Sequence, residues 1–125
     1  MKKRIMILDD DDSIRSLYKN FLVSEGYDVI DAASCEEACE YLLRQKIDLL
    51  LLDIHIPELD GRVMHEVMEE YDKSIPVIVA SVYPLDKQRR IVAGAADYFD
   101  KAEGVNLLLS KIRRILGLSY LAKGP

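Results

Sequence analysis

Short apolar runs recur along the chain, and segments with helical spacing separate them. The runs occupy residues 5–8, 27–30, 49–52, 77–80 and 98–99. Each run is too short for a typical helix, and three of the four-residue runs are apolar throughout instead of alternating with polar residues. Continuous apolar runs of this length are typical of parallel strands that are covered on both faces. The pattern therefore predicts five strands.

Four of the intervening segments carry apolar residues at spacings of three and four, the pattern of a helix with one buried face. They cover residues 14–22, 35–43, 64–71 and 105–116. Gly26 is placed to end the first helix, and Ser34 with Glu37 forms a capping-box pattern before the second. The segment 85–93 also has helical spacing, but half of its stripe is polar, including Gln88. We expect that helix to be the least firmly anchored.

The repeated alternation of strand and helix predicts an α/β fold of three layers, with a parallel sheet and right-handed crossovers. We expect one domain at residues 1–117 and a short tail at 118–125 with no room for an output domain. No apolar run approaches the roughly 18 residues of a membrane-spanning helix. The run after the basic N-terminus is also too short for a signal peptide. We therefore expect a cytoplasmic protein with no membrane partner.

Charge and cysteine content narrow the choice of partners. Seventeen basic and 22 acidic residues give a net charge of −5 over 125 residues, which disfavours nucleic acid as a partner. The last two helical segments carry basic residues, which form either a solvated face or a contact for an acidic partner or a second copy. These residues are Lys87, Arg89, Arg90, Lys111, Arg113 and Arg114. Cys35 and Cys39 fit the apolar face of one helix, as expected in a reducing compartment.

Residues that can carry chemistry stand directly after the predicted strands. Four aspartates beginning at Asp9 follow the first strand, and Asp53, Ser81 and Lys101 follow the third, fourth and fifth. Sites in open parallel sheets form at these carboxyl ends. If the first and third strands are neighbours, Asp9, Asp10 and Asp53 converge, and a cation would relieve their repulsion. Oxygen ligands with room for water suit Mg²⁺. A carboxylate beside Mg²⁺, an ammonium and a hydroxyl is equipped to accept a phosphoryl group.

Four motifs cover these strand ends. They are ILDDD at 7–11, LLLLDIHIP at 49–57 followed by Asp60-Gly61, PVIVAS at 76–81, and GAADYFDK at 94–101. Together they resemble the receiver domain of two-component response regulators, and the resemblance covers about residues 3–117. It implies a flavodoxin-like, five-stranded parallel sheet of order 2-1-3-4-5 with five helices.

The resemblance also implies a role in phosphorelay signal transduction. Asp53 would be the phospho-acceptor, supplied by a phosphohistidine on a sensor histidine kinase or a phosphotransfer protein. Asp10, Asp53 and the backbone carbonyl of His55 would bind Mg²⁺ directly, and Asp9 would bind it through water. Such a chain is a signalling protein that catalyses only its own phosphorylation and dephosphorylation.

Further roles follow from the same resemblance. Lys101 and Ser81 would bind phosphoryl oxygens, and Tyr98 would turn inward when Ser81 moves. The surface of the fourth helix, fifth strand and fifth helix would bind a downstream protein or a second copy of the chain. His55 and Tyr83 occupy the two positions that flank the path of a hydrolytic water in this family. Two rings there predict a long-lived phosphoaspartate, although the imidazole of His55 could instead position the water.

Three departures from the family pattern carry expectations of their own. Ala102 follows Lys101 where the family usually has a cis-proline, and a cis bond before alanine would cost roughly 3 kcal/mol, so we expect a trans bond or a strained site. Val82 replaces a small residue and could crowd the phosphoryl group. Asp11 and Asp12 replace the family's Glu and Pro, and we expect Asp12 to cap the first helix.

Other interpretations remain open at the level of sequence. The acidic run alone could be a solvated turn, and Lys101 alone a surface lysine. A degenerate receiver would act as an interaction module without phosphorylation. A haloacid-dehalogenase-type phosphohydrolase could use Asp9 and Asp11, but it would leave Asp53 and Lys101 unexplained and the chain lacks a cap domain. A flavodoxin is disfavoured because four aspartates after the first strand would repel the phosphate of its cofactor.

Overall fold

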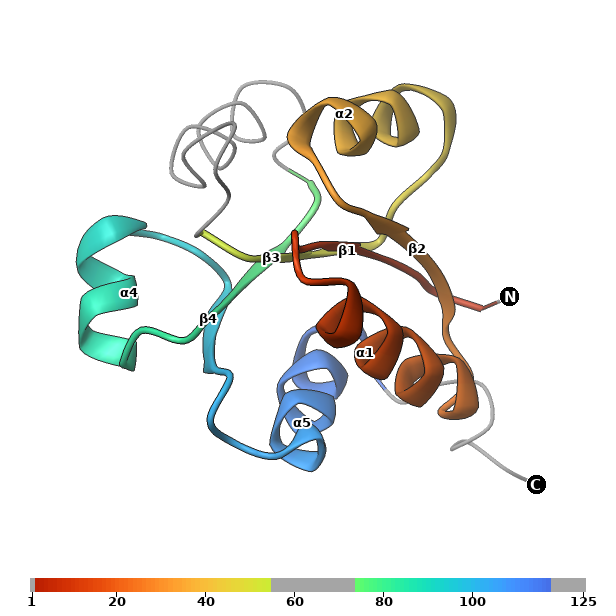
Figure 1. Ribbon diagram of the computed structural model, residues 1–125. Coiled ribbons are helices and arrows are strands. Elements are labelled where there is room, and N and C mark those ends of the chain that lie inside the picture. The colour runs from red at the N-terminus through yellow and green to blue at the C-terminus, as the bar shows by residue number, and fades with distance from the viewer. Residues whose placement is uncertain (1, 55–73, 118–125) are drawn as a thin grey trace.

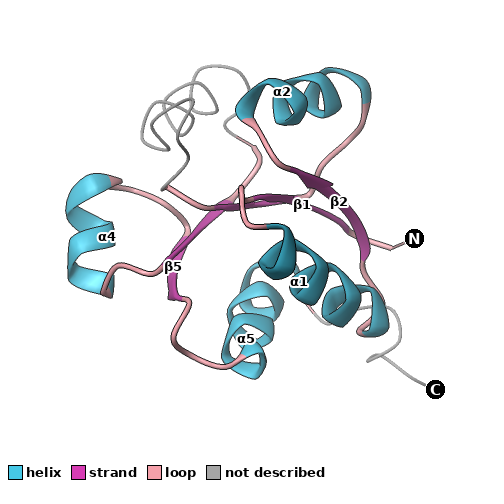
Figure 2. Cartoon of the chain, viewed as in Figure 1, coloured by secondary structure: helices cyan, strands magenta, loops and turns pink. Residues whose placement is uncertain are grey.

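The computed structural model describes residues 2–54 and 74–117, and these form one parallel sheet with helices on both faces (Figures 1 and 2). The strands are β1 (Arg4–Leu8), β2 (Asp28–Ala32), β3 (Leu49–Leu52), β4 (Val77–Ser81) and β5 (Asp97–Asp100). The helices are α1 (Asp12–Ser24), α2 (Cys35–Arg44), α4 (Leu85–Ile91) and α5 (Val105–Leu116). The helix predicted at 64–71 lies outside the described residues. No helix in the described ranges is long and apolar enough to span a membrane.

The strand order is β2-β1-β3-β4-β5, and every neighbouring pair is parallel. This order is flavodoxin-like and confirms the predicted topology. It also confirms the condition on which the predicted acidic site depended, because β1 and β3 are neighbours, with Leu8 beside Leu52. Because the two strands are parallel, the loops after β1 and β3 leave the same edge of the sheet. The strand order reverses between them, and ligands bind at this kind of position in open parallel sheets.

The sheet divides the apolar core into two layers. Helices α1 and α5 cover one face, whereas α2 and α4 cover the other (Figure 1). Because side chains alternate along a strand, Ile5 and Ile7 of β1 pack toward α1 and α5, and Met6 and Leu8 pack toward α2 and α4. Both faces being covered explains why the predicted strands read as continuous apolar runs.

The N-cap of α2 is the residue that the sequence predicted, whereas the N-cap of α1 is a different one. Ser34 caps α2, with its hydroxyl accepting a hydrogen bond from the Glu37 amide at 3.2 Å, as the capping-box pattern predicts. The prediction that Asp12 caps α1 is wrong. Asp11 is the N-cap, and its carboxylate accepts hydrogen bonds from the amides of Ser13 and Ile14 at 2.9 and 3.1 Å. Asp11 has an extended backbone just before the helix, so its carboxylate can accept from the free amides of the first turn, whereas Asp12 is already part of that turn.

Two further predictions concern the loops near the site. The structure has no cis peptide bond in its described ranges, so the bond between Lys101 and Ala102 is trans, as expected. Val82 at the end of β4 is 69% exposed, so its side chain faces solvent.

The two cysteines were predicted to be small core side chains. Cys35 is buried and Cys39 is partly buried among apolar residues, in agreement with that prediction.

Candidate functional site

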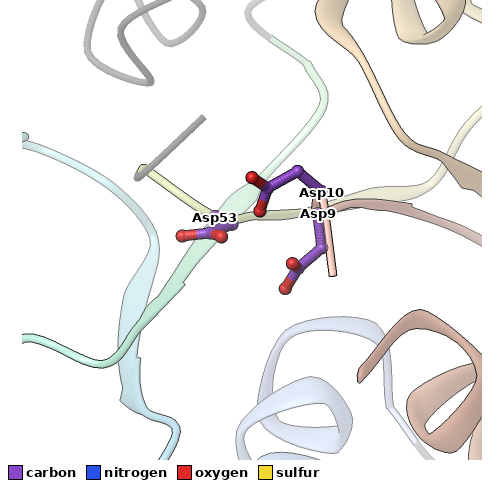
Figure 3. A group of neighbouring side chains, drawn as sticks. All are labelled: Asp9, Asp10 and Asp53. Carbon is purple, nitrogen blue, oxygen red and sulfur yellow. The ribbon is translucent and has the colours of Figure 1, made fainter. Parts of the chain in front are cut away.

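Three carboxylates gather where β1 and β3 end. Each of Asp9, Asp10 and Asp53 offers a carboxylate oxygen, and these oxygens lie within 4.8 Å of one another (Figure 3). Asp9 and Asp53 are buried, whereas Asp10 is exposed to solvent. The structure thus brings together the three acids that the sequence predicted.

The backbone explains why these side chains meet. The Asp53 amide donates to the Leu8 carbonyl at 2.9 Å, and the Asp9 amide donates to the Ala32 carbonyl at 3.2 Å. Both bonds continue the parallel ladder by one residue beyond the last paired position of the strand. The Asp9 carboxylate also accepts from the Asp11 amide at 2.9 Å, which orients the turn that leads into α1. The carboxylates are therefore positioned by sheet pairing and by a local turn.

Lys101 reaches the same cluster from the end of β5. Its Nζ lies 2.6 Å from Asp9 Oδ2 and 3.2 Å from Asp53 Oδ2, and its side chain is 9% exposed. Burial opposes the charge on Lys101, but the hydrogen bond to Asp9 and the charges of Asp53 and Asp9 outweigh burial and raise its pKa. The ammonium is therefore protonated at neutral pH. The Lys101 amide donates to the Ser81 carbonyl at 2.8 Å, which ties this residue to the end of β4.

The donor set fits a hard divalent cation. Three carboxylates against one ammonium leave the cluster with excess negative charge, which a bound cation would balance. All of the donors are oxygen atoms, and the exposed position of Asp10 leaves one side open to water. This combination suits Mg²⁺, which keeps several water ligands in protein sites. The predicted third protein ligand, the backbone carbonyl of His55, lies outside the described residues.

Arg15 is a contributor that the sequence analysis missed. Its guanidinium donates to the backbone carbonyl of Asp9 at 2.7 Å and to Asp31 Oδ2 at 3.3 Å, and it also pairs with Asp12. Lys19 contacts the other oxygen of Asp31 at 3.0 Å. The signal available in the sequence was the spacing of Asp12 and Arg15, three residues apart on one helix. The link to β2 could be seen only after folding.

Ser81 lies at the end of β4, fully buried, with its hydroxyl engaged in a short turn. Ser81 Oγ accepts a hydrogen bond from the Tyr83 amide at 3.2 Å. The Tyr83 side chain is partly buried against the apolar core, and the Lys87 Nζ lies 4.0 Å from the centroid of its ring. The bond from the Lys101 amide to the Ser81 carbonyl places these two residues side by side at the carboxyl edge of the sheet, as the sequence predicted from their positions at the ends of β4 and β5.

Tyr98 lies inward in this structure, and its side chain is 8% exposed. The hydroxyl donates to the Val92 carbonyl at 2.6 Å and accepts from the Ala95 amide at 3.3 Å. The Arg89 guanidinium lies 5.4 Å from the centre of its ring. Tyr98 is thus attached to the C-terminal end of α4. The inward rotation of Tyr98 on activation stays a prediction.

Helix α4 contains a residue whose role the sequence did not reveal. Gln88 is one of the two polar residues in the stripe that predicts weak anchoring of this helix, and its side chain is fully buried. Its amide group donates to the Tyr83 carbonyl at 2.8 Å and to the Phe99 carbonyl at 2.9 Å. A polar side chain can be buried at this position because the backbone carbonyls of Tyr83 and Phe99 accept hydrogen bonds from its amide.

Comparisons with known proteins agree with this arrangement. Residues 5–113 match the family described as the response regulator receiver domain. The chain is 32% identical over 124 residues to the alkaline phosphatase synthesis transcriptional regulatory protein PhoP of Bacillus subtilis (strain 168), which covers 98% of this chain and 52% of that protein. The chain spans about half the length of the curated relatives it matches.

Solved structures lead to the same family. A CheY-like response regulator receiver domain protein from Methanospirillum hungatei JF-1 has a TM-score of 0.84 and 30% identity, over 91% of this chain and 93% of that one. The response regulator protein TrrA of Thermotoga maritima, in complex with Mg²⁺ and BeF, has a TM-score of 0.79 and 27% identity, over 90% of this chain and 98% of that one. The fold, the acidic cluster and the matched motifs lead to one conclusion: the chain belongs to the family of response regulator receiver domains.

Proposed function

We propose that this domain accepts a phosphoryl group on Asp53 from a phosphohistidine of a sensor histidine kinase or phosphotransfer protein, in a step that requires Mg²⁺. The observation that carries the proposal is the position of Lys101 Nζ, 2.6 Å from Asp9 and 3.2 Å from Asp53, beside the cluster of three carboxylates. Phosphoryl transfer requires an oxygen nucleophile and concentrated positive charge. Asp53 would supply the nucleophile, Lys101 supplies one positive charge, and the three carboxylates would attract a cation.

Each residue has a distinct task in this proposal. Asp10 and Asp53 would hold the cation directly, and Asp9 would hold it through water. The bound Mg²⁺ would neutralise charge on the equatorial oxygens of the transferred group. Lys101 keeps an ammonium beside Asp53 and would move from carboxylate to phosphoryl oxygen. Ser81 would offer its hydroxyl to a second phosphoryl oxygen.

The proposed step balances as a simple displacement. A carboxylate oxygen of Asp53 attacks phosphorus, so an O–P bond forms while the N–P bond of the phosphohistidine breaks. The imidazole nitrogen leaves with the electron pair and takes a proton from solvent. No oxidant or reductant takes part. The buried position of Asp53 excludes bulk water from the carboxylate, which favours transfer over hydrolysis.

The partners and location follow the family and are part of the proposal. We infer that the surface of α4, β5 and α5 binds a downstream protein or a second copy, and that the domain works in the cytoplasm. Of the basic residues on α5, Lys111 pairs with Asp97 of β5 at 3.3 Å, whereas Arg113 pairs with Glu25 at the end of α1 at 3.3 Å. Curated relatives are transcriptional regulators by name, so the prediction that nucleic acid is not a partner concerns these 125 residues only.

The proposal is tested by labelling with acetyl phosphate and Mg²⁺, followed by intact-mass analysis. We expect one phosphoryl adduct that is labile to hydroxylamine, and no adduct in Asp53→Asn. Asp86→Asn provides a matched control, because Asp86 is an exposed acid on α4. Labelling that persists in Asp53→Asn would contradict the proposed acceptor. Absence of labelling in the unaltered protein would instead support the degenerate receiver.

A further inference from the structure

Gln88 lies where the ends of β4 and β5 meet the first turns of α4. Its Nε2 has the Tyr83 carbonyl at 2.8 Å, the Phe99 carbonyl at 2.9 Å and the Ser81 carbonyl at 3.4 Å. Three carbonyl oxygens around one nitrogen establish the orientation of the amide, because only the NH₂ side can donate. One side chain of α4 therefore contacts the backbone of both strands that carry the phosphoryl-binding residues.

The carbonyl oxygen of the same side chain is buried and has no hydrogen-bond partner among the described residues. A buried acceptor without a donor is costly, and such groups call for an explanation. An apolar side chain of the same size would fill this space without that cost. The hydrogen bonds that its NH₂ group donates therefore explain why an amide occupies this position.

The backbone of Tyr83 links this amide to Ser81 through two successive peptide groups. The Tyr83 N–H donates to Ser81 Oγ at 3.2 Å, and the Tyr83 carbonyl accepts from Gln88 at 2.8 Å. The Ser81 hydroxyl can donate to a phosphoryl oxygen while it accepts from the Tyr83 N–H, but when Ser81 rotates about χ1 to reach the phosphoryl group, its Oγ moves away from the Tyr83 N–H. The carbonyl of the same residue remains held by Gln88, so displacement of the turn at 82–84 is transmitted to the middle of α4. The bond to Phe99 transmits it to β5 as well.

We propose that Gln88 is a positioning residue that couples the hydroxyl of Ser81 to the placement of α4 and β5. The proposal rests on the proposed phosphorylation of Asp53, because it names how that event would reach the surface. Tyr98 holds the opposite end of α4 through the Val92 carbonyl, and no described hydrogen bond connects it to Ser81. The contacts through Gln88 are continuous from the site to the helix.

The first test compares Gln88→Met with Gln45→Met, the same substitution at an exposed glutamine. Amide exchange of residues 82–93 is measured with and without beryllofluoride and Mg²⁺. We expect Gln88→Met to exchange about tenfold faster in 85–91 before activation, as loss of one or two net hydrogen bonds implies. We also expect its exchange there to lose its response to beryllofluoride, while intact-mass analysis still shows one acetyl phosphate adduct. Gln45→Met should respond as the unaltered chain does.

A double-mutant cycle separates coupling from a general loss of stability. Ser81→Ala removes the acceptor of the Tyr83 N–H, and the double variant with Gln88→Met removes both ends of the relay. If the two residues act in series, the double variant should match Gln88→Met in its α4 response. Additive effects, or a full beryllofluoride response in Gln88→Met, would overturn the proposal. If Gln88→Met does not fold, Gln88→Asn retains the amide on a shorter stem, and an unchanged response in that variant overturns it equally.

Failure of the proposed function would appear differently. An unaltered chain that takes up neither acetyl phosphate nor beryllofluoride refutes phosphorylation of Asp53, and the role of Gln88 falls with it. An unaltered chain that is labelled and responds in α4, together with a Gln88→Met variant that responds equally, refutes the role of Gln88 alone.

Discussion

Replacing Lys101 with methionine removes the ammonium but keeps an unbranched side chain that fills similar space. In the structure this ammonium lies 2.6 Å from Asp9 and 3.2 Å from Asp53, and the three side chains are 9%, 4% and 6% exposed. Removing one partner from a buried ion pair typically costs about 3 to 5 kcal/mol, because the remaining charge loses its compensation. We expect Lys101→Met to lose about that much unfolding free energy in EDTA at pH 7.

Added Mg²⁺ should restore more stability to this variant than to the unaltered protein. A cation that binds only the folded state at 100 times its Kd stabilises it by about 2.7 kcal/mol. In Lys101→Met the carboxylates of Asp9 and Asp53 no longer share their charge with an ammonium, so the cation meets stronger attraction. Urea denaturation with EDTA or with about 10 millimolar Mg²⁺, which is about 100 times the Kd of a site whose Kd is about 0.1 millimolar, measures both quantities.

Lys111→Met is the matched control. Lys111 also pairs with one aspartate, Asp97, at 3.3 Å, but the two side chains are 18% and 17% exposed. More exposed pairs contribute about 0 to 1 kcal/mol, and this pair is remote from the acidic cluster, so Mg²⁺ should not distinguish the control from the unaltered protein. The reasoning is refuted if the two lysine variants lose equal stability in EDTA. It is also refuted if Mg²⁺ stabilises Lys101→Met no more than the unaltered chain.

Three other predictions test separate parts of the site. Asp10→Ala should leave stability in EDTA nearly unchanged, because Asp10 is exposed, but should abolish the rise in melting temperature with Mg²⁺; a persisting rise would place the ligands elsewhere. For Asp31, burial opposes ionisation, yet Lys19 and Arg15 outweigh it and lower the pKa. The stability it adds is complete above its ordinary pKa of about 4 and is lost as pH falls through the lower folded value, so the gap between Asp31→Asn and the unaltered chain should close at acid pH in thermal melts. Tyr83→Ala should lose the phosphoryl group faster in a timed dephosphorylation assay, and an equal or slower rate would contradict shielding by the ring.

The sequence by itself determined the sheet and the acids at its edge. Apolar runs such as 49–52 are local, and their continuity already implies strands covered on both faces. The positions of Asp9, Asp53 and Lys101 follow directly, since the residue after a parallel strand must lie at the carboxyl edge. The one assumption was that β1 and β3 are neighbours, which the observed strand order confirms.

Tertiary structure alone decided which polar residues are buried and what they hold. Helical periodicity records only apolar faces, so it did not reveal that the side chains of Gln88 and Arg15 contact backbone carbonyls on other elements. Phe99 is 11 residues from Gln88, and Asp9 is 92 residues from Lys101. The inward position of Tyr98 was likewise decided by a carbonyl at the end of α4. A buried polar side chain is stabilised only where partners converge from several elements, and that convergence exists only in the folded chain.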